Sequence, residues 1–455
     1  MRIMTASPSL FTKICVRKFS SNWKQTKHID PPVAGYPDYA VKVKSLPNKI
    51  IVAAVDNNCS LISRVSIVFR AGTRYETYNT RGVTQCLKVA AGCATKNYSR
   101  FAIMRNLQEL CTPLTCSVGR EVISYTLEGK SSSVDQALDY LVDVASNAVF
   151  KRWEVIENIP RLKIELESRT PQQFVVDLVH QAAYRSSGLG NSIYIPKHKL
   201  DHVEVEHLEQ HVSNYFVGAN CAIVGAGVNI KELISLGECI NLEKNGCEEK
   251  CPAIMHGGEI RSDKGGCVAY VAIAGEGASW RNPKELFSFA ILHRALGSGT
   301  YITHTSENKS PLAKILRSAP AYLNSITAFN YNYSDSGLFG VLLTANYSDI
   351  PCVIGSVYKT LRQGKISAED FERGKQQAKV SFLLSAESGH SYVGDIATQV
   401  MSNGCAYSPC MITEALDCIT IKDVNEAAEK LMNGKFSIAS AGRLDNVPRL
   451  SDLCV

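Results

Sequence analysis

The pattern of apolar and polar positions predicts the same order of elements twice along this chain. In each copy an apolar strand ends at an Ala-Gly pair, and a polar stretch and a helix follow. A second strand with an amphipathic helix, a longer helix ending near Glu-Ser, and a closing helix and strand complete the copy. The predicted pairs are strands 63–69 and 267–273, strands 123–127 and 338–345, helices 131–149 and 350–361, helix ends 163–168 and 383–388, helices 205–216 and 424–431, and strands 221–225 and 436–441.

This duplication predicts an α+β fold with two homologous halves, each a β-sheet covered by helices on one side, that enclose a cleft. The Gly-rich and charged stretch 243–266 marks the connection between the halves. We expect an N-terminal half at 36–240, a linker at 241–258 and a C-terminal half at 259–455. No window approaches the ~20 apolar residues of a membrane-spanning helix, so we expect membrane association only through partners.

The first 29 residues contain no Asp or Glu and are rich in Ser, Lys and Arg. Such a segment is typical of a mitochondrial presequence, and we expect residues 1–19 to be cleaved. Removing them takes away four basic residues and leaves 45 basic against 43 acidic residues, so most of the net charge of +6 belongs to this segment. The remaining balance gives no support for nucleic-acid binding, which needs a concentrated basic face.

The 16 cysteines are spread along the chain without a Cys-x-x-Cys pair. This spacing does not fit zinc ribbons or fingers, and we expect mostly reduced thiols that pack as small apolar side chains. The sequence also contains no P-loop and no Cys-x-x-Cys-His haem-attachment motif. We therefore expect no cofactor.

The segments Ala71–Thr77 and Gly82–Val89 carry a family signal. Their frame resembles the pitrilysin-like zinc peptidases, the inverzincins, and in particular the mitochondrial processing peptidase. In those enzymes the helix carries His-x-x-Glu-His, in which the histidines hold Zn²⁺ and the Glu is the base. The resemblance places Gln85 and Val89 at the two ligand positions and Lys88 at the base position. Because these side chains cannot hold zinc, we expect neither a catalytic nor a metal site.

The resemblance also implies a third ligand position, a Glu on a later helix, and Glu165 falls near it. One carboxylate without the two histidines does not make a metal site. We interpret Glu165 as a solvated or salt-bridged residue.

The segment Ala328–Gly340 resembles the signature of the second half in this family. Segments 150–155, 182–185 and 257–261 resemble the core 2 branch, whose members belong to mitochondrial complex III, ubiquinol–cytochrome c reductase. The resemblance implies a structural subunit, not itself an enzyme, that supports electron transfer from ubiquinol to cytochrome c without redox centres of its own. It would lie peripherally on the matrix side of the mitochondrial inner membrane.

The partners implied by the resemblance are core protein 1, cytochrome b, cytochrome c1, the Rieske protein and small subunits, within a dimeric complex. In the peptidase relatives the cleft holds an extended peptide as an added strand, so a presequence peptide in the cleft is a further hypothesis. We interpret Tyr331, Tyr333 and Phe339 as core or inter-half packing residues.

Two alternatives remain at this point. The non-catalytic alpha subunit of the processing peptidase binds presequences with a long glycine-rich loop, whereas 296–303 contains only two glycines here. The second alternative is an independent zinc peptidase. Separately, one cluster of histidines has metal-like spacing. That cluster consists of His198, His202, His207 and His211, and the apolar stripe of the predicted helix 205–216 explains it without a metal.

Overall fold

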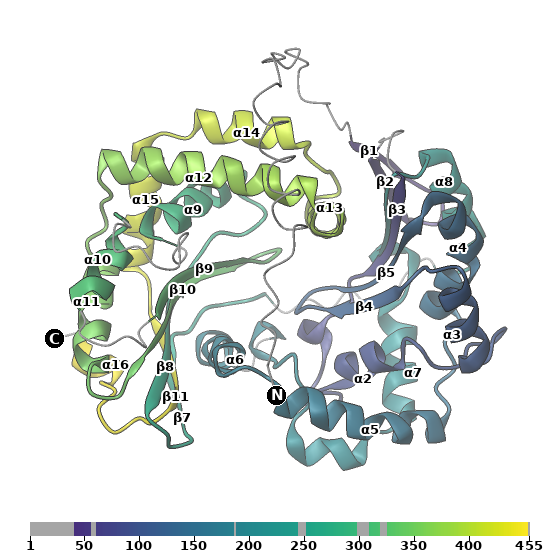
Figure 1. Ribbon diagram of the computed structural model, residues 1–455, viewed down its shortest axis with the longest axis horizontal. Coiled ribbons are helices and arrows are strands. Elements are labelled where there is room, and N and C mark those ends of the chain that lie inside the picture. The colour runs from purple at the N-terminus through teal and green to yellow at the C-terminus, as the bar shows by residue number, and fades with distance from the viewer. Residues whose placement is uncertain are drawn as a thin grey trace, which may run out of the picture. The chain divides into compact units, whose positions relative to one another are not determined.

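The computed structural model describes residues 41–55, 61–185, 188–243, 252–297, 309–318 and 325–453 (Figure 1). The expected presequence 1–19 lies outside these residues. Residues 298–303, in the segment that corresponds to the glycine-rich loop, also lie outside them, as do residues 244–251 of the expected linker. Among the described residues, no helix is long and apolar enough to cross a bilayer.

The N-terminal half contains a mixed sheet with the strand order β1-β2-β6-β3-β5-β4. Its neighbours pair antiparallel, except that β2 and β6 run parallel. The apolar runs that predicted β3, β5 and β6 become the central strands, which are buried on both faces. The strands are β1 Val41–Ser45, β2 Ile51–Val55, β3 Ile62–Phe69, β4 Leu114–Val118, β5 Ile123–Lys130 and β6 Cys221–Ala226.

The C-terminal half repeats this sheet with the order β7-β11-β8-β10-β9. The pair β7–β11 runs parallel, as β2–β6 does, and the other pairs run antiparallel. The order therefore matches β2-β6-β3-β5-β4 strand for strand, which confirms the predicted duplication. The strands are β7 Gly258–Asp263, β8 Val268–Glu276, β9 Ser325–Asn332, β10 Gly337–Asn346 and β11 Ser437–Gly442.

The interpretation of the whole stretch 243–266 as a connection is wrong at its end, because Gly258–Asp263 forms β7. This strand lies at the edge of its sheet and is hydrogen-bonded to β11. Edge strands tolerate charged side chains because one side of the strand faces no neighbour. The glycines and charged residues of this segment therefore predict a linker, whereas pairing with β11 makes the end of the segment a strand.

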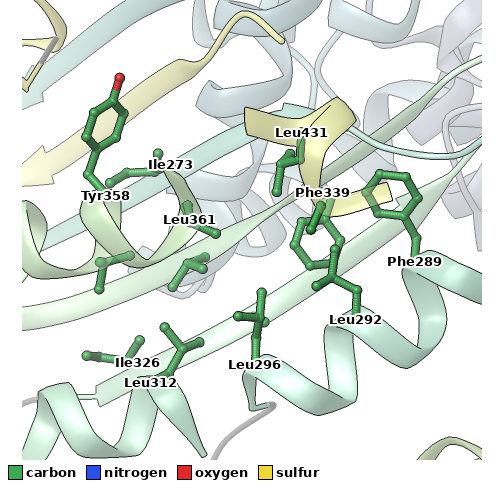
Figure 2. Close-up of a cluster of buried hydrophobic side chains, with 14 of the residues drawn as sticks. Ile273, Phe289, Leu292, Leu296, Leu312, Ile326, Phe339, Tyr358, Leu361 and Leu431 are labelled. Carbon is green, nitrogen blue, oxygen red and sulfur yellow. The ribbon is translucent and has the colours of Figure 1, made fainter. Parts of the chain in front are cut away.

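Helices cover the outer face of each sheet and enclose a separate core in each half. In the C-terminal half, Phe289 and Leu292 point towards Phe339 of β10, and the two aromatic rings lie 5.4 Å apart (Figure 2). The N-terminal helices are α2 Val83–Ala90, α3 Arg100–Glu109, α4 Ser131–Ser146, α5 Arg152–Glu167, α7 Val205–Tyr215 and α8 Ile230–Cys239. The C-terminal helices are α9 Pro283–Leu296, α10 Pro311–Ser318, α11 Ile350–Arg362, α12 Ala368–Glu387, α14 Pro409–Cys418, α15 Ile421–Asn433 and α16 Leu450–Leu453.

Two further helices are exchanged between the halves. Helix α6, Pro171–Tyr184, follows α5 but packs its buried face on β8 and β11 of the C-terminal sheet (Figure 1). Helix α13, Gly389–Asn403, follows α12 and packs on β2, β3 and β6 of the N-terminal sheet. The expectation of helices on one face only is thereby corrected. The exchange explains why the described residues of both halves belong to one compact unit.

Candidate functional site

The start of helix α2 is fixed by a buried carboxylate. Gly82 precedes the helix with a φ of +93° and supplies no side chain that could cap it. The Glu76 carboxylate accepts hydrogen bonds from the Gly82 N–H at 3.0 Å, the Thr84 N–H at 2.8 Å and the Thr84 hydroxyl at 2.5 Å. Glu76 thus caps the helix from a distance in sequence. Burial raises the pKa of Glu76 to about 7, although these donors oppose that rise.

Three of the four positions singled out from the sequence meet one turn into this helix. Gln85 Nε2 donates to the Glu165 carboxylate at 3.2 Å, and Lys88 Nζ lies 3.3 Å from both of its oxygens. The Gln85 amide oxygen accepts a hydrogen bond from the Ile195 N–H at 2.7 Å. The Glu165 carboxylate is therefore bound by an ammonium group and an amide of the protein. The positive charge beside this carboxylate is that of Lys88.

The fourth position, Val89, is 4% exposed and belongs to the core of the N-terminal half. Its side chain offers packing and no donor atom. Within the described residues, no three His, Cys, Asp or Glu side chains are grouped so that they could hold a metal ion.

The histidine cluster is divided between different partners. His211 is buried, its Nε2 lies 3.0 Å from the Ala71 carbonyl oxygen, and burial lowers its pKa to about 4. His207 lies one turn earlier on the same helix, is only partly buried and contacts Glu204 at 3.5 Å. The i, i+4 spacing therefore does not direct the two imidazoles to one point.

The signature segment of the second half, Ala328–Gly340, contacts a buried histidine of helix α6 and thereby joins the two halves. His180 Nδ1 lies 2.6 Å from the Val176 carbonyl, which can only accept, so Nδ1 carries the proton. His180 Nε2 then accepts from the Tyr333 hydroxyl at 2.8 Å, and burial holds the pKa of His180 well below its usual value. Tyr184 adds bonds to Ser336 and the Gly337 carbonyl, both at 2.9 Å. The interpretation of Tyr333 as a core or inter-half packing residue agrees with its burial and its bond to His180.

An ionic network continues this contact. Arg74 bonds Glu121 at 2.7 Å within its own half and Asp335 at 2.7 and 2.5 Å in the other half. Glu121 also accepts from the Ser334 N–H at 2.9 Å and the Ser334 hydroxyl at 2.6 Å. The sequence identifies Ser334 and Asp335 as parts of a family signature. It does not identify Arg74 and Glu121 as their partners, because residue spacing does not reveal contacts between distant segments.

Two joined hollows of about 570 and 580 Å³ lie beside the site formed by Gln85, Lys88 and Glu165. They share Leu166, Arg169, Phe174, Lys197 and Lys264 in their linings, and Tyr194 and Ile195 line the second hollow next to Gln85. Sequence reasoning missed these residues, because the basic side chains come from separate segments and form no motif.

Two family models match the chain: "Insulinase (Peptidase family M16)" over residues 51–197 and "Peptidase M16 inactive domain" over residues 202–378. The mitochondrial cytochrome b-c1 complex subunit 2 of Homo sapiens is 31% identical over 414 residues, which cover 90% of this chain and 91% of the human protein. A probable alpha-1 subunit of the mitochondrial-processing peptidase of Arabidopsis thaliana is 25% identical, covering 92% of this chain and 85% of the plant protein.

Among solved structures, a chain of the structure described as complex III2 from Candida albicans with Inz-5 bound matches with a TM-score of 0.79. The match covers 91% of this chain and 99% of the other, at 20% sequence identity. At that identity the similarity shows the fold, and it shows that both halves belong to it.

Proposed function

Because this chain belongs to peptidase family M16 and resembles cytochrome b-c1 complex subunit 2 over nearly its whole length, we propose that it is a non-catalytic core subunit of mitochondrial complex III. Its role is to support electron transfer from ubiquinol to cytochrome c by assembling and stabilising the complex. The observation that carries this proposal is the engagement of Glu165 by Lys88 and Gln85, with Val89 in the core. The M16 fold is retained in both halves, whereas the metal-binding groups are replaced.

A duplicated apolar stripe supports a role in assembly. On α5 the side chains of Trp153, Ile156 and Ile164 are 61%, 52% and 65% exposed and follow one face of the helix. On α12, the counterpart of α5, Val380 and Leu384 are 54% and 58% exposed and lie one turn apart. Contiguous exposed apolar side chains of this kind are typical of protein–protein interfaces.

The proposed partners are core protein 1, cytochrome b, cytochrome c1, the Rieske protein and the small subunits of a dimeric complex. We place the chain on the matrix side of the mitochondrial inner membrane, attached through these partners. Residues 1–19 are proposed as a cleaved presequence, with halves at 36–240 and 259–455 joined by a linker at 241–258. The proposal does not include a presequence peptide between the halves, because Arg and Lys predominate in the hollows there and would repel a cationic peptide.

The test is a native gel of detergent-solubilised mitochondria that carry a tagged chain. We expect the chain to migrate with cytochromes b and c1 at the size of the dimeric complex. Trp153→Glu together with Ile156→Glu should reduce the share of chain in that band while the free chain remains folded. Migration as a soluble heterodimer that cleaves presequences would instead support the role of a processing peptidase alpha subunit.

A further inference from the structure

The two joined hollows follow α6 at the place where the halves meet. One wall comes from the end of α5 and the segment leading into α6, and another from the turn between β7 and β8. Apolar side chains form much of the surface, including Leu166, Phe174, Leu178, Ile195 and Tyr270. The volume of each hollow lies in the range of a small-molecule site.

Basic side chains predominate in this lining. They come from five segments of the chain and are Arg81, Arg169, Arg185, Lys197 and Lys264. Only Asp177 and Glu167 supply negative charge. Asp177 is already neutralised, because its carboxylate pairs with the buried Arg120 at 2.7 Å and accepts from the Ser192 hydroxyl at 2.6 Å. The lining therefore carries a positive excess.

These cations are crowded together. Arg169 stacks on the rings of Phe174 and Tyr194, at 4.2 and 4.8 Å from their centroids, and Lys264 Nζ lies 3.7 Å from the centroid of Phe174. Burial lowers the pKa of Lys264, and the charges of Arg169 and Lys197 lower it further. Arg169 also lies 3.9 Å from the Asp177 carboxylate, and Arg185 donates to the Gly257 carbonyl oxygen at 3.2 Å. Among the described residues, Arg81, Arg185, Lys197 and Lys264 have no carboxylate partner, and Arg81 Nε is buried without an acceptor.

We propose that these joined hollows bind an acidic polypeptide segment, with its carboxylates on the Arg and Lys side chains and its apolar side chains on Phe174, Leu178 and Tyr270. Guanidinium groups bind carboxylates with two parallel hydrogen bonds. Apolar side chains pack against aromatic rings. Arg169, Lys197 and Lys264 line both hollows, whereas Arg81 and Arg185 line only the second, so the cations extend beyond a single cluster that one small anion would fill. A chain with several carboxylates can reach more of them.

The positive charge of the lining disfavours a presequence peptide, which is the ligand that the family resemblance suggests. A presequence is cationic, as the acid-free first 29 residues of this chain illustrate. Arg and Lys on the hollow walls repel such a peptide and attract one of opposite charge. The inference does not depend on membership of complex III, since it rests on the lining of the hollows alone.

The experiment measures fluorescence anisotropy of a labelled peptide that alternates Glu with apolar residues, added to the purified full-length chain. We expect saturable binding that weakens as the salt concentration rises. Lys197→Glu together with Lys264→Glu, both at exposed positions, should weaken binding at least about tenfold. The matched control is Lys231→Glu with Lys422→Glu, which makes the same charge change at exposed positions away from the hollows and should leave binding unchanged.

Three outcomes would overturn the proposal. The first is equal binding of the same peptide with Lys in place of Glu. The second is an equal loss of binding in the hollow variant and the control variant, with circular dichroism showing both folded. The third is hollow-dependent binding of inorganic pyrophosphate or of anionic phospholipid vesicles in the absence of acidic-peptide binding. Migration with cytochromes b and c1 is unaffected by any of these, so this inference and the proposed function can fail separately.

Discussion

Arg74 and Asp335 stand 261 residues apart in the sequence, and two hydrogen bonds of 2.7 and 2.5 Å join their side chains across the two halves. Both side chains are largely buried, with exposed fractions of 3% and 12%. Burial would raise the pKa of Asp335, but the hydrogen bonds from Arg74 and the Ala253 N–H outweigh it and hold that pKa below its usual value. The second-half signature therefore serves to join the halves.

Replacing Arg74 with Ala should destabilise the chain by about 3–5 kcal/mol, because it leaves Glu121 and Asp335 as buried carboxylates without their cation. Urea unfolding followed by tryptophan fluorescence measures the change in the free energy of unfolding. The matched control is Arg100→Ala, which removes the exposed ion pair with Glu157 and should cost less than about 1 kcal/mol. Similar losses in the two variants would contradict the importance of the inter-half network.

Sequence reasoning succeeded where a local pattern determines the element. The apolar run before Ala71 predicts β3, and the periodic apolar positions between Leu286 and Leu296 predict α9. It failed for α6 and α13. An apolar helix face such as Val175, Val179 and Ala183 indicates burial, but it does not say which sheet buries it. Helix exchange is a property of tertiary packing and leaves no local signal.

The candidate site shows the same limit. The resemblance identifies Gln85, Lys88 and Glu165 one by one, and the sequence is compatible with either a solvated or a salt-bridged Glu165. Its partner Lys88 lies 77 residues away, and only the packing of α5 against α2 joins the two. The basic hollows could not be predicted at all, because their cations come from five separate segments.

Glu76 should make the stability of this chain depend on pH. Its pKa is about 7 in the folded protein, against about 4.3 in an unfolded chain. The folded state thus retains the proton that the unfolded state has lost, and the stabilising contribution is present below about pH 4 and is lost as the pH rises to 7. Relative to Glu76→Gln, the free energy of unfolding should fall by on the order of 2 kcal/mol between pH 5 and 7.

The measurement is urea unfolding of the parent chain and of Glu76→Gln at several pH values. Glu165→Gln is a suitable second variant, because it also removes one carboxylate but lies in a half-exposed ion pair. Parallel curves for the parent chain and Glu76→Gln would show that Glu76 has the same affinity for protons in both states.

Gly82→Ala should destabilise the chain by about 1–3 kcal/mol. The φ of +93° disfavours any residue with a Cβ, and that atom would lie 2.5 Å from Cγ1 of the buried Ile195. Thermal unfolding measures the loss. Gly394→Ala is the control, since this glycine lies in α13 with open space around its Cβ position, and the change should stabilise by about 0.5–1 kcal/mol. Tolerance of Ala at position 82 would mean that the helix start can shift.

Restoring the three lost groups should restore zinc binding. We expect Gln85→His, Lys88→Glu and Val89→His together to give a chain that retains about one zinc ion after dialysis, as measured by elemental analysis. Positions 85 and 89 lie one turn apart on α2, and the Gln85 amide already reaches the Glu165 carboxylate at 3.2 Å. Removing the Lys88 ammonium also removes the positive charge that repels the metal.

The matched control adds Glu165→Ala to the same three changes and should lower zinc retention, because two histidines then lack their third ligand. His at position 89 replaces a buried Val of the core, so the triple variant should also unfold at a lower temperature than the parent chain. If the folded triple variant retains no more zinc than the parent chain, then α2 and α5 have moved apart since the metal was lost, and Lys88 and Glu165 pair in a geometry that no longer fits a zinc site.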